Sequence, residues 1–114
     1  MPAAKPRQPA DADYHLVREG RADEFNRLRA AGKPCDVRGC DLRGIDMTKI
    51  DVANLDLSDC YFRQADLRGM DLRTCRMAGA SLHGAHVSGA YFPAELAPEE
   101  IDMSVRLGTR MRYR

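Results

Sequence analysis

The feature that most constrains the fold of this chain is an uninterrupted repeat of five residues. From residue 35 to residue 94 the sequence divides into twelve consecutive pentads, and the first and third residues of every pentad are apolar. Because 44% of the chain is apolar, chance would produce this pattern with a probability on the order of 10⁻⁹. An amphipathic helix repeats every three or four residues and a strand every two, so neither element explains a period of five.

A coil with four straight sides does explain it. If the first and third residues point inward, the other three can turn a corner, and four pentads close one coil of 20 residues. Twelve pentads then give three coils, stacked at about 4.8 Å like neighbouring strands. Half of the fifth positions are glycine, which suits a tight corner because it has no Cβ. Residues 20 apart should stack in an inward core ladder, formed by Leu42, Phe62 and Leu82 on one wall and by Val52, Leu72 and Phe92 on another.

The repeated unit resembles that of the pentapeptide-repeat proteins, which approximates A(D/N)LXX. Residues 65–69, ADLRG, match it closely. The resemblance implies an all-β fold, a right-handed quadrilateral β-helix with small residues at the first pentad position. Ile45, Ile50, Leu55 and Met70 depart from that rule, so we expect the walls to spread around them. The resemblance implies little about function, although some family members imitate duplex DNA and inhibit or protect type II topoisomerases.

The N-terminal flank follows other patterns. Residues 1–10 contain three prolines and no large apolar side chain apart from the first methionine, which predicts a disordered tail. Residues 11–34 predict a helical hairpin that caps the repeats. Its first helix would be capped by Asp11 or Asp13 and ended by Gly20.

The C-terminal flank, residues 95–114, also breaks the period of five. Pro98, Glu99 and Glu100 predict the start of a short helix, which Gly108 can end. The alternation in residues 109–114 then predicts a short strand. Since solenoids normally protect their open ends, both flanks are expected to cap the β-helix of residues 35–94.

Charge and cysteine content exclude several classes. Eighteen Lys and Arg residues against seventeen Asp and Glu residues give a net charge of +1, so neither direct nucleic-acid binding nor membrane association is expected. The first residues hold no apolar stretch of signal-peptide length, which predicts a cytoplasmic protein. There we expect reduced, buried thiols rather than disulfides or metal ligands at the four cysteines, Cys35, Cys40, Cys60 and Cys75.

No arrangement of residues in the sequence predicts catalysis. His86 would stack in register with Asp46 and Asp66, and His83 lies on the neighbouring wall. A proton shuttle or a metal on that column can be imagined, but the outer wall of a β-helix lacks an enclosed pocket. We therefore expect no enzyme activity, no cofactor and no metal.

The acidic residues of the repeats favour an alternative function. Seven pentads carry Asp at the second position, and an acidic rod could act as a DNA mimic that regulates or protects a type II topoisomerase such as gyrase. However, five pentads carry Arg at the fourth position. Mixed charge of this kind is more typical of a self-paired, solvated wall.

The main prediction is a non-enzymatic structural or protein-interaction module, a scaffold or adaptor for an unidentified protein partner. Because coil-on-coil stacking is driven by the backbone, we also expect a homo-oligomer, either a dimer or an end-to-end stack. The basic C-terminal strip should dock on an Asp column of its own chain, of a second copy or of a partner, and two tyrosines are candidate anchors. These candidate interaction residues are Arg110, Arg112, Arg114, Tyr61 and Tyr91.

Overall fold

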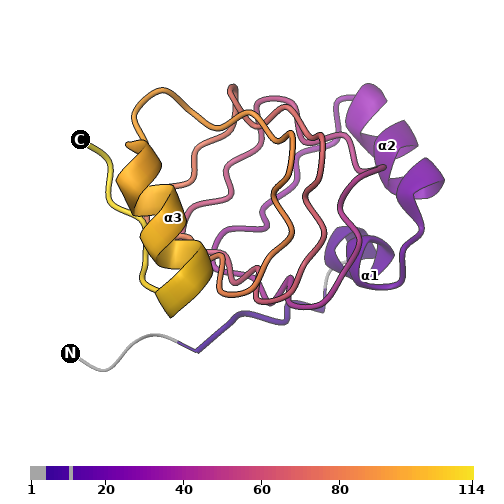
Figure 1. Ribbon diagram of the computed structural model, residues 1–114. Helices are drawn as coiled ribbons and strands as arrows, with labels where there is room; N and C mark the ends of the chain where they lie inside the picture. Colours follow the sequence, from indigo (N-terminus) through magenta and orange to yellow (C-terminus); the bar gives the residue numbers. More distant parts are fainter. Residues whose placement is uncertain (1–4, 11) are drawn as a thin grey trace.

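The computed structural model describes residues 5–10 and 12–114. Helices α1 (Ala12–Arg18) and α2 (Ala22–Ala30) precede the repeats, and α3 (Pro98–Leu107) follows them. Figure 1 shows α1 and α2 at one end of a stack of coils and α3 at the other end. In the described part of the chain no strand or sheet is assigned, and isolated β-bridges join the coils.

The bridges establish a coil of 20 residues. Six parallel bridges join residues that are 20 positions apart. On one wall they run from Asp41 to Tyr61 and from Tyr61 to Ser81, and on the next wall from Asp66 to His86. This is the register predicted from the pentads.

Each pentad is followed by a tight turn. The N–H of a first-position residue donates to the carbonyl three residues earlier, as Leu55 does to Val52 at 2.9 Å. Nine of the twelve fifth-position residues have a positive φ, for example 60° at Asp59 and 81° at Gly79; Lys49, Thr74 and Ala94 do not. A positive φ at this place is the mark of a type II turn, which explains the many glycines.

Aspartate at the second position has a local structural role. Its Oδ1 accepts the backbone N–H of the residue two positions later, which closes an Asx turn before each corner. The seven residues that make this bond, at 2.8 to 3.2 Å, are Asp36, Asp41, Asp46, Asp51, Asp56, Asp66 and Asp71. The acid of the repeat is therefore part of the backbone geometry.

The core is the predicted ladder. Leu42, Phe62, Leu82, Val52 and Leu72 are buried. Phe92 in the last coil is only partly buried against the same cluster. The bulky first-position residues are accommodated as well, because Ile45, Ile50, Leu55 and Met70 all belong to the buried core.

The N-terminal segments close the first coil with side chains. Tyr14 of α1 donates its hydroxyl to the carbonyl of Asp41 at 2.8 Å. Asn26 of α2 donates to the carbonyl of Lys49 at 2.9 Å and accepts the N–H of Asp51 at 2.7 Å. Three arginines donate to further carbonyls of this coil: Arg7 to Arg38 (2.8 Å), Arg18 to Arg43 (2.6 Å) and Arg29 to Ala53.

The C-terminal segment takes the place of a fourth coil. Within the stack, third- and fifth-position N–H groups donate to the coil above, as Phe62 does to Ser81 at 2.9 Å. In the last coil the corresponding groups donate to the cap instead. These bonds run from Met77 to the Tyr113 hydroxyl (2.8 Å), from Gly79 to the Met111 carbonyl (2.7 Å), from Leu82 to Ser104 Oγ (2.9 Å) and from Gly84 to the Val105 carbonyl (2.9 Å).

The wall formed by residues 45–49, 65–69 and 85–89 is only partly covered at the ends of the stack. Among the described residues, the N–H groups of Asp46 in the first coil and of Val87 and Gly89 in the last have no hydrogen-bond partner. Val87 is correspondingly half-buried, whereas Leu67 beneath it is buried.

The N-terminal flank differs from the predictions in two places. Residues 5–10 of the predicted tail run along the coils (Figure 1). The backbone N–H of Arg7 donates to the carbonyl of Gly39 (2.7 Å), and the Arg7 carbonyl accepts the N–H of Asp41 (2.8 Å). Residues 1–4 and Asp11, one of the two cap candidates, lie outside the described residues. Asp13, the other candidate, lies inside the first turn of α1.

The predicted C-terminal strand is an extended segment rather than an assigned strand. Within the described chain its one β-bridge is antiparallel, between Arg110 and Ser81. It cannot extend a parallel ladder, because the chain has reversed direction through α3. Met111 is buried and Tyr113 is partly buried against the core, as their alternation suggested.

Replacing Ser104 by alanine should weaken the C-terminal cap. Ser104 is fully buried, and its Oγ accepts the Leu82 N–H while donating to the Thr109 carbonyl at 2.6 Å. Leaving a buried N–H without a partner costs about 1–3 kcal/mol. We expect Ser104→Ala to lower the free energy of unfolding, measured by urea denaturation, by about this amount. Ser88→Ala, at an exposed position, is the control, and equal effects of the two changes would contradict the role of Ser104.

Candidate interaction surface

Two of the candidate interaction residues, Tyr61 and Arg110, lie together on one corner of the stack. Arg110 crosses the last coil beside Ser81 and reaches the second coil. Its guanidinium donates to the Tyr61 hydroxyl and lies over the Tyr61 ring, 5.1 Å from the centroid. The same guanidinium lies 3.5 Å from Asp59 Oδ1 and donates to the carbonyl of Gly79 at 3.3 Å. The sequence left open whether this arginine docks on its own chain, on a second copy or on a partner. In the structure Arg110 contacts its own chain.

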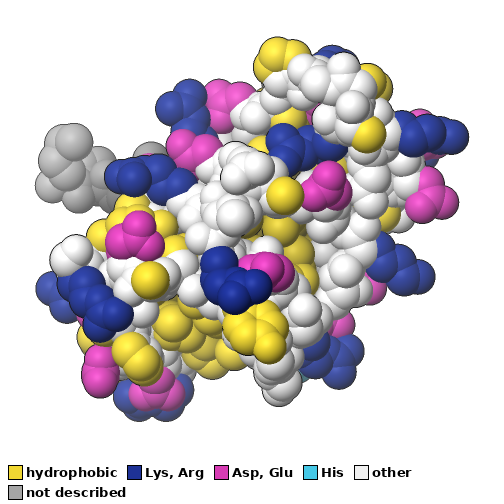
Figure 2. Space-filling view, turned by 90° about the horizontal axis from the view of Figure 1, so that it is seen from above, with side chains coloured by type: hydrophobic (Ala, Val, Ile, Leu, Met, Phe, Trp, Pro, Cys, Tyr) yellow, Lys and Arg dark blue, Asp and Glu magenta, His cyan; other side chains and the backbone are white. Residues whose placement is uncertain are grey.

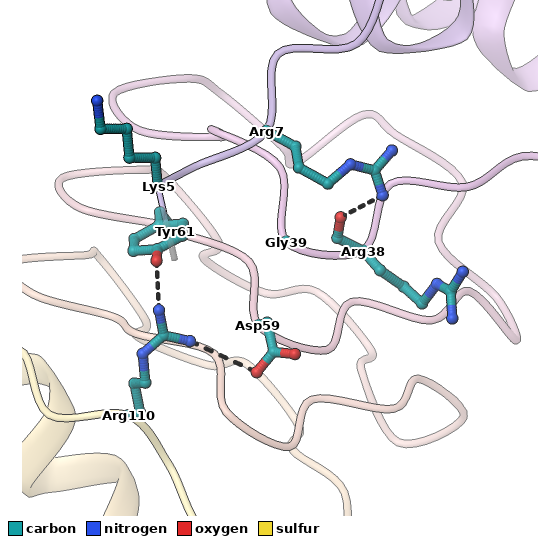
Figure 3. Close-up of a pocket in the computed structure, with 7 residues that line it drawn as sticks. All are labelled: Lys5, Arg7, Arg38, Gly39, Asp59, Tyr61 and Arg110. Carbon is teal, nitrogen blue, oxygen red and sulfur yellow. Dashed lines mark hydrogen bonds and ion pairs between the residues drawn. The ribbon is translucent and has the colours of Figure 1, made fainter. Parts of the chain in front are cut away.

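These residues line a surface groove of about 420 Å³. Figure 3 shows Tyr61, Lys5 and Arg110 on one side of the groove, with Arg7 and Arg38 on the other. The full lining comprises Lys5, Arg7, Arg38, Gly39, Asp59, Tyr61 and Arg110. The groove thus combines the N-terminal segment, two coils and the C-terminal segment.

Few carboxylates neutralise the basic side chains of the groove. Arg38 pairs with both oxygens of Asp36 at 3.0 and 3.1 Å, and Arg7 lies 3.6 Å from the same carboxylate. The Arg38 hydrogen bonds lower the pKa of Asp36 to about 2. Among the described residues, Lys5 has no ion-pair partner. The groove is therefore a net positive surface.

The other candidate residues lie elsewhere. Arg112 donates through its guanidinium to both oxygens of Glu100 in α3, each at 3.1 Å, and Arg114 donates to a backbone carbonyl of the last coil at 2.7 Å. Both therefore hold the C-terminal cap in place. Tyr91 is 58% exposed on a different wall, where Arg73 lies over its ring at 4.9 Å.

Sequence reasoning identified Arg110 and missed the other three basic residues of the groove, Lys5, Arg7 and Arg38. Arg38 could have been placed there, because the register of 20 puts Gly39 directly below Asp59. Lys5 and Arg7 carried no such signal, since their segment has no repeat and its place depends on pairing with the first coil.

The comparison with known families agrees with the repeat seen in the coils. The family described as pentapeptide repeats matches residues 56–92, in eight copies. Residues 56–92 of this chain are pentapeptide repeats. Pentapeptide repeats imply a β-helix, in agreement with the coil of 20 residues. No curated protein and no solved structure matches the chain.

The walls of the coils neutralise much of their own charge. Where the fourth residue of an Asp-containing pentad is arginine, its guanidinium pairs with that carboxylate; the pairs are Arg38–Asp36, Arg43–Asp41, Arg68–Asp66 and Arg73–Asp71. Figure 2 shows basic and acidic side chains beside one another on one face. Arg63 is the exception: its pentad has Tyr61 in place of Asp, and no carboxylate in the described chain pairs with it.

The thiols of the repeats are structural. All four cysteines are free, and Cys35 is the one that is only partly buried. The Cys60 thiol donates to the carbonyl of Val37 at 3.0 Å and the Cys75 thiol to that of Val52 at 3.1 Å. Burial raises the pKa of Cys60 to about 12 and that of Cys75 to about 11. Both thiols are protonated near neutral pH, which makes them weak nucleophiles.

The described residues show neither a metal centre nor a membrane span. No group of three His, Cys, Asp or Glu side chains among them could hold a metal ion. His86 stays in register with Asp66, as the sequence suggested. Within the same residues, no helix has the length and apolar character needed to cross a bilayer.

The Asp–Arg pairs predict sensitivity to acid. Hydrogen bonds from Arg68 and Arg73 lower the pKa of Asp66 and of Asp71 to about 2, whereas an unfolded Asp titrates at about 3.9. A carboxyl with a lowered folded pKa stabilises the protein above its unfolded pKa and loses this effect as pH falls to its folded pKa. The free energy of unfolding, measured by urea denaturation, should therefore decrease from pH about 4 to about 2.

Asp66→Asn tests the origin of this effect. The amide can still accept the N–H of Arg68 but does not titrate, so the decrease with pH should be smaller than in the unmodified protein. An identical pH dependence in both proteins would contradict the contribution of the Asp66–Arg68 pair.

Proposed function

We propose that this pentapeptide-repeat protein is a non-enzymatic protein-interaction module, a scaffold or adaptor that binds its partner at the groove beside Tyr61. The groove itself is the observation that carries this proposal. It gathers Tyr and Arg side chains, the types that most often anchor protein interfaces. The four free cysteines favour a reducing compartment such as the cytoplasm.

We infer further that the β-helix is right-handed and quadrilateral, with about three coils. Turns that recur every five residues support four sides to a coil, and bridges between residues 20 apart support the closed square. Such a stack is stiff, because each coil is hydrogen-bonded to the next along its walls. A stiff body suits a binding surface, since little conformational entropy is lost on association.

Self-association stays a prediction. Both ends of the stack carry segments of the chain itself, α1 and α2 at one end and α3 with residues 109–114 at the other. End-to-end stacking would require one of these caps to move, whereas pairing of two walls would not. The structure thus favours a lateral dimer over a filament as the form of any oligomer.

Regulation or protection of gyrase as a DNA mimic stays the alternative. The charge arrangement gives it little support, because Asp66 and Asp71 each pair with an arginine two residues later. A mimic needs carboxylates that are free to pair with a DNA-binding surface. Inhibition or protection of gyrase by the purified protein in a supercoiling assay would favour this alternative over the module.

Site-specific photocrosslinking tests the module. Tyr61→p-benzoylphenylalanine places a crosslinker in the groove, and Tyr91→p-benzoylphenylalanine places one at another tyrosine that also has an arginine over its ring. We expect position 61, and not position 91, to crosslink the same partner protein reproducibly in cells that contain the full chain. Mass spectrometry of the crosslinked species identifies the partner, including a second copy of this protein. Absence of any crosslink at position 61, or equal crosslinking at both positions, would contradict the proposal.

A further inference from the structure

We propose that the groove binds an acidic segment of the partner protein, whose Asp or Glu carboxylates pair with Lys5, Arg7 and Arg110. The proposal rests on the proposed function and specifies the chemistry of the partner. It follows from three features of the groove: its excess of positive charge, one weak internal ion pair, and an arginine that is already oriented.

The excess charge is local. Lys5, Arg7, Arg38 and Arg110 line the groove, and only Asp59 in the lining and Asp36 beside it are acidic. The whole chain carries a net charge of +1. The rest of the molecule therefore has a small negative balance, and the groove is where an anion is attracted.

The weak internal pair joins Arg110 to Asp59. Their closest N–O distance is 3.5 Å, and the two side chains are 36% and 63% exposed. An exposed pair with this geometry contributes little to stability. A carboxylate of the ligand can take the place of Asp59 beside Arg110 without disturbing the core.

The orientation of Arg110 is set by other contacts. Its guanidinium is held by the Tyr61 hydroxyl and ring and by the carbonyl of Gly79. A guanidinium held in this way loses less side-chain entropy when it binds a carboxylate. Arg7 is restrained similarly by its bond to the carbonyl of Arg38.

The acids of the groove favour a peptide over a nucleic acid. Asp36 and Asp59 lie between the cations, so a phosphodiester chain with a charge on every nucleotide would meet them at close range. Carboxylates along a polypeptide are separated by uncharged backbone and can pair with individual cations. The volume of about 420 Å³ fits a few side chains rather than a long polymer.

The test uses the full chain and a fluorescent hexaglutamate peptide, with hexaglutamine as the uncharged control, measured by fluorescence anisotropy at low salt. Lys5→Glu should raise the Kd for hexaglutamate about fivefold, since one exposed ion pair contributes up to about 1 kcal/mol. Lys49→Glu makes the same change of net charge at an exposed position outside the groove. It should change the Kd less than about twofold.

A second variant should increase affinity. Asp59→Asn removes the competing carboxylate next to Arg110 and keeps a residue type that tolerates the positive φ of 60° at this position. We expect the Kd for hexaglutamate to fall about threefold, within the range of one exposed charge interaction. Asp23→Asn, an exposed position in α2, is the matched control and should leave the Kd unchanged.

Each of the following results would overturn the proposal: no preference for hexaglutamate over hexaglutamine, equal effects of Lys5→Glu and Lys49→Glu, or no gain of affinity in Asp59→Asn. Tighter binding of a single-stranded oligothymidylate at the same groove would overturn it in favour of nucleic acid. These failures are distinct from failure of the module itself. A partner crosslinked at position 61 without hexaglutamate binding would reject the acidic ligand and leave the module in place.

Discussion

The structure depends on backbone hydrogen bonds between residues that are 20 positions apart. Each coil donates to and accepts from its neighbours, so a coil inside the stack satisfies most of its polar backbone groups with other backbone groups, and Asp side chains accept the fourth-position N–H groups. A stack of about three coils has little interior, however. Without caps, the first and last coils would each expose a row of backbone groups to water or to another chain.

The two ends solve this problem by different means. At the first coil only Arg7 pairs through its backbone, and long arginine side chains from the N-terminal segment and both helices reach single carbonyls. At the last coil the backbone itself returns: Met111 and Val105 offer their carbonyls, while Ser104 and Tyr113 offer hydroxyl groups. Helix α3 is thus placed by hydrogen bonds as well as by its apolar face, which explains why a serine is fully buried there.

The groove is a consequence of how the ends are closed. Arg7 is fixed because its backbone pairs with the first coil, and this pairing brings Lys5 to the same corner. Arg110 reaches the corner from the opposite end, because its segment pairs with the last coil. Tyr61 lies between them, in a pentad that lacks the usual Asp. The basic and acidic side chains therefore do not balance at this corner, which carries an excess of positive charge.

The sequence by itself determined the period, the register of 20, the core ladder and the positions of the three helices. These follow from local patterns, since every pentad repeats the same apolar positions and the helices begin or end at proline and glycine. Only the tertiary structure decided that residues 5–10 pair with the first coil and that Arg110 reaches Tyr61. Neither segment is periodic, and each is placed by backbone groups that become available only when the stack ends. For the same reason Tyr61 and Arg110 could be named from the sequence as candidates, whereas their proximity and the contribution of Lys5 and Arg7 could not.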